Sequence, residues 1–183
     1  MNSSRLASRF ASAVIAILAN LTAAATSPAS EATSFSPTDQ KVIIATALEV
    51  EKAILAEDVS DLLRLVTRTE GLTCTDTLYS FKEIRAFLAD KQSDLYLSLF
   101  RSDDFGKKCG EGYPLEYPAI SEKDFLQTAD KSFSVIRLEA DWAKVIIKSP
   151  VKTHYPREWY FHREGRTWKL AGASFIIGNC TCG

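Results

Sequence analysis

The chain has 183 residues and a mass of 20.3 kDa, with 22 basic and 23 acidic side chains. Its contents of 46% apolar and 25% charged residues are those of an ordinary globular protein, which excludes a disordered chain, a collagen-like chain and a multi-span membrane protein. The net charge of −1 and the pI near 6.1 argue against a nucleic-acid-binding protein, which needs a basic surface. This length suits one domain preceded by a processed segment.

The first 25 residues have the pattern of a secretory signal peptide. Arg5 and Arg9 precede a short apolar run at residues 10–21, and Ala23-Ala24-Ala25 offers a cleavage site. As a helix this run would extend about 18 Å, which is too short for a hydrocarbon core of about 30 Å. We therefore predict cleavage after Ala25 and no membrane span.

Cleavage would leave two further parts. Residues 26–36 are small, polar and proline-containing, which predicts a flexible lead-in, and residues 37–183 are expected to form a single domain. Because the removed segment contains two arginines and no acid, the net charge changes from −1 to −3. We expect an exported protein, either periplasmic or secreted.

Four cysteines lie in the exported part: Cys74, Cys109, Cys180 and Cys182. An even number in an oxidising compartment predicts disulfides. A Cys74–Cys109 bridge with a short Cys180–Cys182 bridge is our first expectation, and a bridge from the C-terminal tail to Cys74 or Cys109 is the alternative. A metal site formed by Cys180, Cys182 and His162 lacks four-ligand spacing, so no metal and no cofactor are expected.

Helix start signals recur in the first half of the chain. Ser36, Pro37 and Asp39 predict a helix that runs to about residue 56 and buries one face. Residues 102–120 contain three glycines and two prolines and are expected to be an irregular loop. Shorter helices are predicted after further capping residues, namely Asp58, Ser80, Ser93 and Ser121.

The hydrophobic period changes from helical to alternating after residue 130. Four runs predict antiparallel strands, and Glu164-Gly165 is expected to be a two-residue hairpin turn between the last two. Helices followed by strands predict an α+β domain. The runs are residues 134–140, 143–148, 158–163 and 166–177, and residues 71–77 are expected to be a strand or an extended loop.

Two segments, together with the long N-terminal helix, resemble the nuclear transport factor 2-like, or cystatin-like, superfamily. They are YSFKEIRAFL at residues 79–88 and WYFHREGRTWKLA at residues 159–171. The resemblance implies a bent antiparallel sheet around the long helix, with a cone-shaped cavity. The expected helical insert at residues 93–129 departs from the pattern. The superfamily includes isomerases, dehydratases, transport adaptors and non-catalytic secreted domains, so the fold does not decide the function.

One candidate function is a small enzyme of isomerase or hydrolase type with its site in the cone. Isomerases of this superfamily use a carboxylate base and a tyrosine hydroxyl, which suggests Asp76 and Tyr79 here, with His162 as a further acid–base group. The simpler interpretation is that Asp76 is a turn residue. Alternation points His162 away from Trp159 and Phe161, which are expected to face inward.

The favoured candidate is a non-catalytic binding domain. Its partner would be another exported protein, as for an inhibitor or immunity protein, or a small apolar ligand. Trp142, Trp159 and Tyr160 are candidate contact residues because aromatic side chains gather in the C-terminal strands, although most are expected to be core. Arg137 is a candidate for a polar ligand, with a surface ion network as the alternative, in which Arg137 and Glu139 meet Lys144 or Lys148.

The same alternation predicts an aromatic wall in the last hairpin. Trp168 and Leu170 share a face, and Trp159 and Phe161 on the neighbouring strand share the same face. We expect these four side chains to pack against the long helix.

Overall fold

The computed structural model describes residues 34–74, 77–109, 120–128, 130–151 and 157–173. The chain divides into two units, Met1–Ala32 and Thr33–Gly183, and all described residues belong to the second. No helix among them is long and apolar enough to span a bilayer. The helices are α1 (Pro37–Leu55), α2 (Val59–Leu65), α3 (Phe81–Ala89), α4 (Asp94–Phe100), α5 (Ser102–Cys109) and α6 (Glu122–Thr128), and the strands are β1 (Leu72–Cys74), β2 (Thr77–Tyr79), β3 (Ser132–Arg137), β4 (Trp142–Lys148), β5 (Arg157–Glu164) and β6 (Thr167–Ala173).

The predicted capping residues start the helices. Ser36 accepts a hydrogen bond from the backbone N–H of Asp39 at 3.1 Å, and Ser80 and Glu83 form a reciprocal capping box. The same type of cap begins three more helices, at Asp58, Ser93 and Ser121. The buried face of α1 contains Ile43, Ala47, Val50 and Ile54, so the prediction that this helix buries one face is confirmed.

One expected loop is partly helical. Residues 102–109 form α5, although residues 102–120 were expected to be irregular. Asp103 and Asp104 occupy the first turn, and Lys107 and Lys108 occupy the last, so the charges complement the helix dipole and offset the cost of Gly106. Residues 110–119 lie outside the described part.

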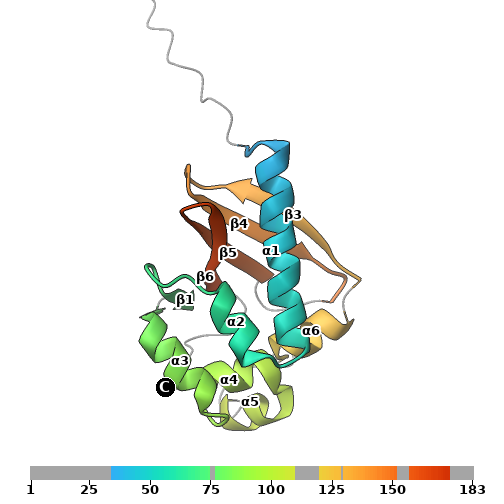
Figure 1. The fold of residues 1–183 in the computed structure, drawn as a ribbon. Helices are drawn as coiled ribbons and strands as arrows, with labels where there is room; N and C mark the ends of the chain where they lie inside the picture. Colours follow the sequence, from blue (N-terminus) through green and yellow to red (C-terminus); the bar gives the residue numbers. More distant parts are fainter. Residues whose placement is uncertain (1–33, 75–76, 110–119, 129, 152–156, 174–183) are drawn as a thin grey trace, which may run out of the picture. The chain divides into compact units, whose positions relative to one another are not determined.

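The sheet has six strands in the order β2-β1-β6-β5-β4-β3, with β2 and β3 at its two open edges. The four C-terminal strands pair antiparallel, as predicted. The expectation of a wholly antiparallel sheet is wrong, because β1 pairs with β6 in parallel, Thr73 opposite Gly172. A parallel pair needs a long crossover, and here helices α3 to α6 and strands β3 to β5 supply it. The α+β class is confirmed, with a mixed and open sheet. Figure 1 shows α1 lying across one face of this sheet.

Two predicted boundaries shift. The turn between β5 and β6 consists of Gly165 and Arg166, because Glu164 pairs with Thr167 as the last rung of the hairpin. Gly165 has φ of +62°, a left-handed conformation that glycine adopts without strain. Phe35 belongs to the core and not to a flexible lead-in, because its ring packs edge-on against Trp168 at 5.2 Å.

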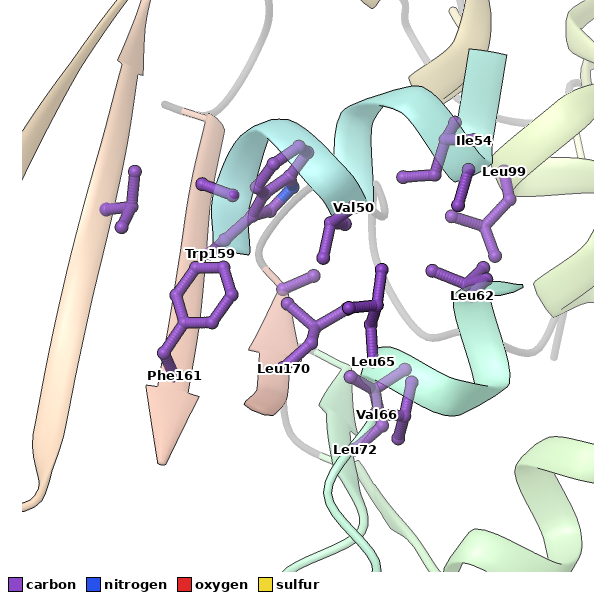
Figure 2. Packing of buried hydrophobic residues seen from close by; sticks show 14 of the residues in the cluster. Val50, Ile54, Leu62, Leu65, Val66, Leu72, Leu99, Trp159, Phe161 and Leu170 are labelled. Carbon is purple, nitrogen blue, oxygen red and sulfur yellow. The ribbon is translucent and has the colours of Figure 1, made fainter. Parts of the chain in front are cut away.

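The core lies between the sheet and helices α1, α2 and α4. Figure 2 shows Trp159 and Leu170 pointing from their strands toward Val50 of α1. Trp159 and Phe161 are 0% exposed, and Trp168 and Leu170 are each 3% exposed. The predicted aromatic wall is therefore confirmed.

Glu164 ties the last hairpin to the loop that follows α2. One of its carboxylate oxygens accepts hydrogen bonds from the Arg68 N–H at 2.8 Å, from the N–H and hydroxyl of Thr69, and from the Thr67 hydroxyl. Burial alone would raise the pKa of Glu164, but these bonds outweigh it and lower the pKa to about 2.

The hydrogen bonds that Glu164 accepts from residues 67–69, which we call the Glu164 clamp, predict an acid-sensitive contribution to stability. A carboxyl whose pKa is lowered on folding stabilises the protein above its ordinary pKa of 4.5, and the contribution disappears as the pH falls toward 2. Because the side chain is partly exposed, we expect Glu164→Gln to cost only about 1 kcal/mol at pH 7. Urea melts at pH 7 and pH 3 measure this. The difference in free energy of unfolding between parent and variant should be smaller at pH 3 than at pH 7. An equal difference at both pH values would contradict the Glu164 clamp.

Candidate functional site

The face of the sheet toward α1 is filled by the core. Trp159, Phe161 and Leu170 occupy the place where the resembled superfamily would have its cone-shaped cavity, and Val145 beside them is also 0% exposed. Side chains exposed by 3% or less leave no room for a substrate among them. The expected open cone is thus closed by large apolar residues.

The predicted acid–base residues are not brought together. Tyr79 lies on β2, and His162 lies on β5, with β1 and β6 between them. At about 4.8 Å per strand this separates them by about 14 Å. Asp76 lies outside the described residues.

Tyr79 instead lines a small pocket at the start of α4. The pocket has a volume of about 250 Å³, and Asp94 on its wall forms an ion pair with Lys108 at 2.6 Å. The ring of Tyr79 contacts Phe87 edge-on at 5.3 Å and is 8% exposed. Tyr79 therefore contributes mainly to packing, with one side toward this pocket.

The opposite face of the sheet collects three of the predicted residues. The strand register places Trp142 directly opposite His162, and Lys144 directly opposite Tyr160. The Trp142 and His162 rings stack with their centroids 4.7 Å apart. We call this set, together with Glu158, the outer-face patch. Glu158, Tyr160 and His162 share this face, so the prediction that His162 points away from Trp159 and Phe161 is confirmed.

A charged carboxylate organises the polar half of the outer-face patch. The Tyr160 hydroxyl donates to one oxygen of Glu158 at 2.7 Å, and the Lys144 ammonium lies 3.1 Å from the other. Burial, the hydrogen bond to Glu158 and the charge of Glu158 together raise the pKa of Tyr160 to about 12. Tyr160 therefore stays a neutral hydroxyl, and its ring and Trp142 form half-buried aromatic surfaces.

His162 is positioned by neighbours on both sides. Its Nε2 lies 3.5 Å from a carboxylate oxygen of Asp141, and its ring is held by the stack on Trp142. Its Nδ1 is buried and has no hydrogen-bond partner within the described part of the chain. This environment fixes the orientation of the imidazole.

The other two predicted contact residues lie away from the outer-face patch. Trp159 is enclosed in the core, where its indole N–H donates to Glu122 at 3.2 Å. Arg137 lies on the core side of β3, with its guanidinium 5.5 Å from the ring centre of Phe35. The predicted ion network is wrong, because Lys144 faces the other side of the sheet and pairs with Glu158.

The disulfide prediction falls on residues whose side chains are not described. Cys74 ends β1 and Cys109 ends α5, but only their backbones are described. Cys180 and Cys182 lie outside the described part. The pairing remains a prediction.

A second, more polar groove lies where α5 and α6 begin, with a volume of about 650 Å³. Glu57 stands at its wall with φ of 53°, and it accepts from Lys123 at 2.6 Å and pairs with Arg101 at 3.4 Å. The hydrogen bond from Lys123 lowers the pKa of Glu57 against the effect of burial. Local sequence patterns could not reveal this charged cluster, because Arg101 and Lys123 lie 44 and 66 residues from Glu57 in the sequence.

Asp124 also lines this groove. The hydroxyls of Ser102 and Ser121 both donate to one oxygen of Asp124, and the Ser121 N–H donates to Ser102 at 2.8 Å. Burial works against ionisation, but these bonds lower the pKa of Asp124 overall. Glu57 and Asp124 are therefore each bound by neighbouring polar groups of the groove.

The described part of the chain is thus an α+β domain with an open mixed sheet, one face of which is covered by helices. No family model matches the sequence, and no curated protein matches it significantly. A solved protein of unknown function from the DUF3225 family of Pectobacterium atrosepticum is similar at 16% identity and a TM-score of 0.43, over 76% of this chain and 90% of that one. A cystatin-like fold protein from Burkholderia xenovorans is similar at 15% identity and a TM-score of 0.45, over 76% of this chain and 91% of that one. At these identities and TM-scores the likeness concerns the fold alone.

Proposed function

We propose that this chain is a non-catalytic binding domain that acts after export, and that the outer-face patch contacts its partner. The observation that carries the proposal is the division of aromatic residues between the two faces of the sheet. Trp159 and Phe161 are buried inside, whereas Trp142 and Tyr160 are half-buried on the face that α1 leaves uncovered.

The chemistry of this patch suits a protein partner. Aromatic rings with a polar tip are enriched at protein–protein contacts, because they bury apolar area and still offer a hydrogen bond. Lys144 and Glu158 provide a satisfied charge pair beside them, as in the polar rim of an interface. Another exported protein, bound as an inhibitor or immunity protein binds its target, is the partner that we favour over a small apolar ligand.

Affinity capture from the native envelope fraction tests the proposal. The parent protein should retain a partner that the Trp142→Ala variant loses, with binding weakened at least about tenfold, as for an interfacial aromatic anchor. Leu48→Ala, on the exposed side of α1, is the matched control and should bind like the parent. A partner that binds Trp142→Ala as well as the parent would contradict the assignment of the outer-face patch.

The proposed export has its own measurable consequence. The arginine-flanked apolar run and the Ala23-Ala24-Ala25 site predict that the mature protein begins at Thr26. N-terminal sequencing of the protein recovered outside the cytoplasm measures this. A mature protein that still began at Met1 would contradict it.

A further inference from the structure

The edge strand β3 has no hydrogen-bond partner on its outer side within the described part of the chain. Leu138 donates its N–H to Trp142, and on the other side of β4 Arg163 donates to Asp141. In an antiparallel ladder these two bonds place the even-numbered residues of β3 toward β4. The backbone groups of Phe133, Val135 and Arg137 therefore point out of the sheet.

This edge lacks the features that usually prevent strands from pairing between molecules. β3 has the sequence SFSVIR, with no proline, no glycine and no charge before its last residue. The bulge in the sheet lies at Tyr160 and Phe161, between β5 and β6, and so does not twist this edge away. Ile136 and the following Leu138 are 40% and 46% exposed. By contrast, the other edge strand, β2, has only three residues.

We propose that two copies of the chain associate through antiparallel pairing of β3 with β3, so that their sheets join into one. A two-fold axis perpendicular to the sheet meets the requirement that paired residues lie on the same face, and it uses the same surface on both copies. With the axis at Val135, each Phe133 lies opposite Arg137 of the other copy. The three outward residues of each strand then supply about six backbone hydrogen bonds in total.

The charges beside β3 favour this register. With the axis at Val135, Lys131 lies opposite Glu139 of the second copy, and this pair occurs twice. With the axis at Ser134, Lys131 would instead lie opposite Arg137, a like-charge pair that is destabilising. With the axis at Ile136, Phe133 would lie opposite Glu139, beyond the end of β3. Only Val135 and Arg137 would then pair within the strand, so this register would form fewer backbone hydrogen bonds.

In the dimer, Lys131 would share its ammonium between Glu51 of its own copy and Glu139 of the other. Its Nζ lies 2.6 Å from Glu51 of α1 and 2.6 Å from the Leu126 carbonyl, and Glu139 is exposed beyond the other end of β3. Pairing would also cover Ile136 and Leu138 opposite Ser134 and Ser132 of the second copy. The association is independent of the outer-face patch and would set two such patches side by side on one sheet.

Sedimentation velocity across a wide range of protein concentration tests the association. The parent should be a dimer that dissociates on dilution. Val135→Pro removes an N–H that points to solvent in the monomer, so the fold should survive while dimer affinity falls at least about tenfold. A parent that stays monomeric at all concentrations would overturn the proposal.

A charge reversal tests the register and does not depend on proline being tolerated. Glu139→Lys places two positive charges opposite each other and should weaken the dimer at least about threefold. Glu70→Lys makes the same change at an exposed site away from β3 and should leave the dimer unchanged. A dimer indifferent to both Glu139→Lys and Val135→Pro would have to use another surface, which also overturns the proposal.

Amide hydrogen exchange provides a third readout. In the dimer the amides of Phe133, Val135 and Arg137 should gain protection as the protein concentration rises, whereas Ser134 and Ile136 are protected in both states. Exchange of the odd-numbered amides that is independent of concentration would rule out this edge.

Discussion

Replacement of Trp168 by alanine is expected to remove a large part of the free energy of unfolding. Trp168 is 3% exposed and lies between the ring of Phe35 at 5.2 Å and the guanidinium of Arg163, which is 6.0 Å from its ring centre. Truncation of a packed tryptophan costs about 3–5 kcal/mol, a large part of a domain stability of about 5–15 kcal/mol. Urea melts of parent and variant measure the loss.

The matched control for this loss is His162→Ala on the other face of the same hairpin. The side chain of His162 contacts Trp142 and Asp141 but fills no core space, so its removal should cost about 1 kcal/mol or less. Equal losses of free energy of unfolding for the two variants would mean that the outer face of the sheet stabilises the fold as much as the core does. A Trp168→Ala variant that melts like the parent would show that the aromatic wall is not needed for folding.

Replacement of Arg157 by methionine is expected to have a comparably large effect, for an electrostatic reason. Arg157 is 3% exposed and lies 3.2 Å from a carboxylate oxygen of Glu122, which is 0% exposed. Its guanidinium also donates to the Ile120 carbonyl at 3.0 Å and lies over the ring of Phe125. Removal of one partner of a buried ion pair leaves the other charge unpaired and costs about 3–5 kcal/mol.

The pH dependence of Arg157→Met identifies the cause. Burial raises the pKa of Glu122 above 4.5, opposed by the charge of Arg157 and the hydrogen bond from Trp159. A carboxyl with a raised pKa favours folding below its unfolded pKa, and this contribution is lost as the pH rises through the folded value. Without Arg157 the pKa of Glu122 rises further, so the variant should be less destabilised relative to the parent at pH 5 than at pH 8.

A second substitution separates charge from packing. Glu122→Gln in the Arg157→Met background removes the stranded carboxylate and should recover part of the lost stability at pH 8. Thermal melts at both pH values measure the recovery. A double variant no more stable than Arg157→Met would indicate that the contact of Arg157 with Phe125 matters more than its charge.

Local signals in the sequence were sufficient for all the helices except α5 and for the faces of the strands. Ser36, Asp58, Ser80 and Ser93 cap helices through contacts within three residues, so their effect is legible in any short segment. The alternation of Trp159 and Phe161 with Tyr160 and His162 likewise follows from the period of a strand. These features depend on neighbours along the chain.

The same local signals failed where the outcome depends on distant partners. Both the parallel pairing of β1 with β6 and the packing of Phe35 on Trp168 join residues that are far apart in the sequence. The α5 helix forms in a glycine-containing segment whose first residue is fastened to Asp124 of α6. No short window of sequence contains both partners of such contacts.

The sequence by itself determined where α1, α2, α3, α4 and α6 begin, the α+β class and which side chains of each strand share a face. The tertiary structure alone decided which strands are neighbours, and hence that Trp142 and Tyr160 meet Lys144 and Glu158 on one surface while Tyr79 and His162 stay apart. It also decided that the place of the expected cavity is filled. The physical reason is that capping and alternation are set within a few residues, whereas strand order and core filling depend on which apolar surfaces from the whole chain exclude water together.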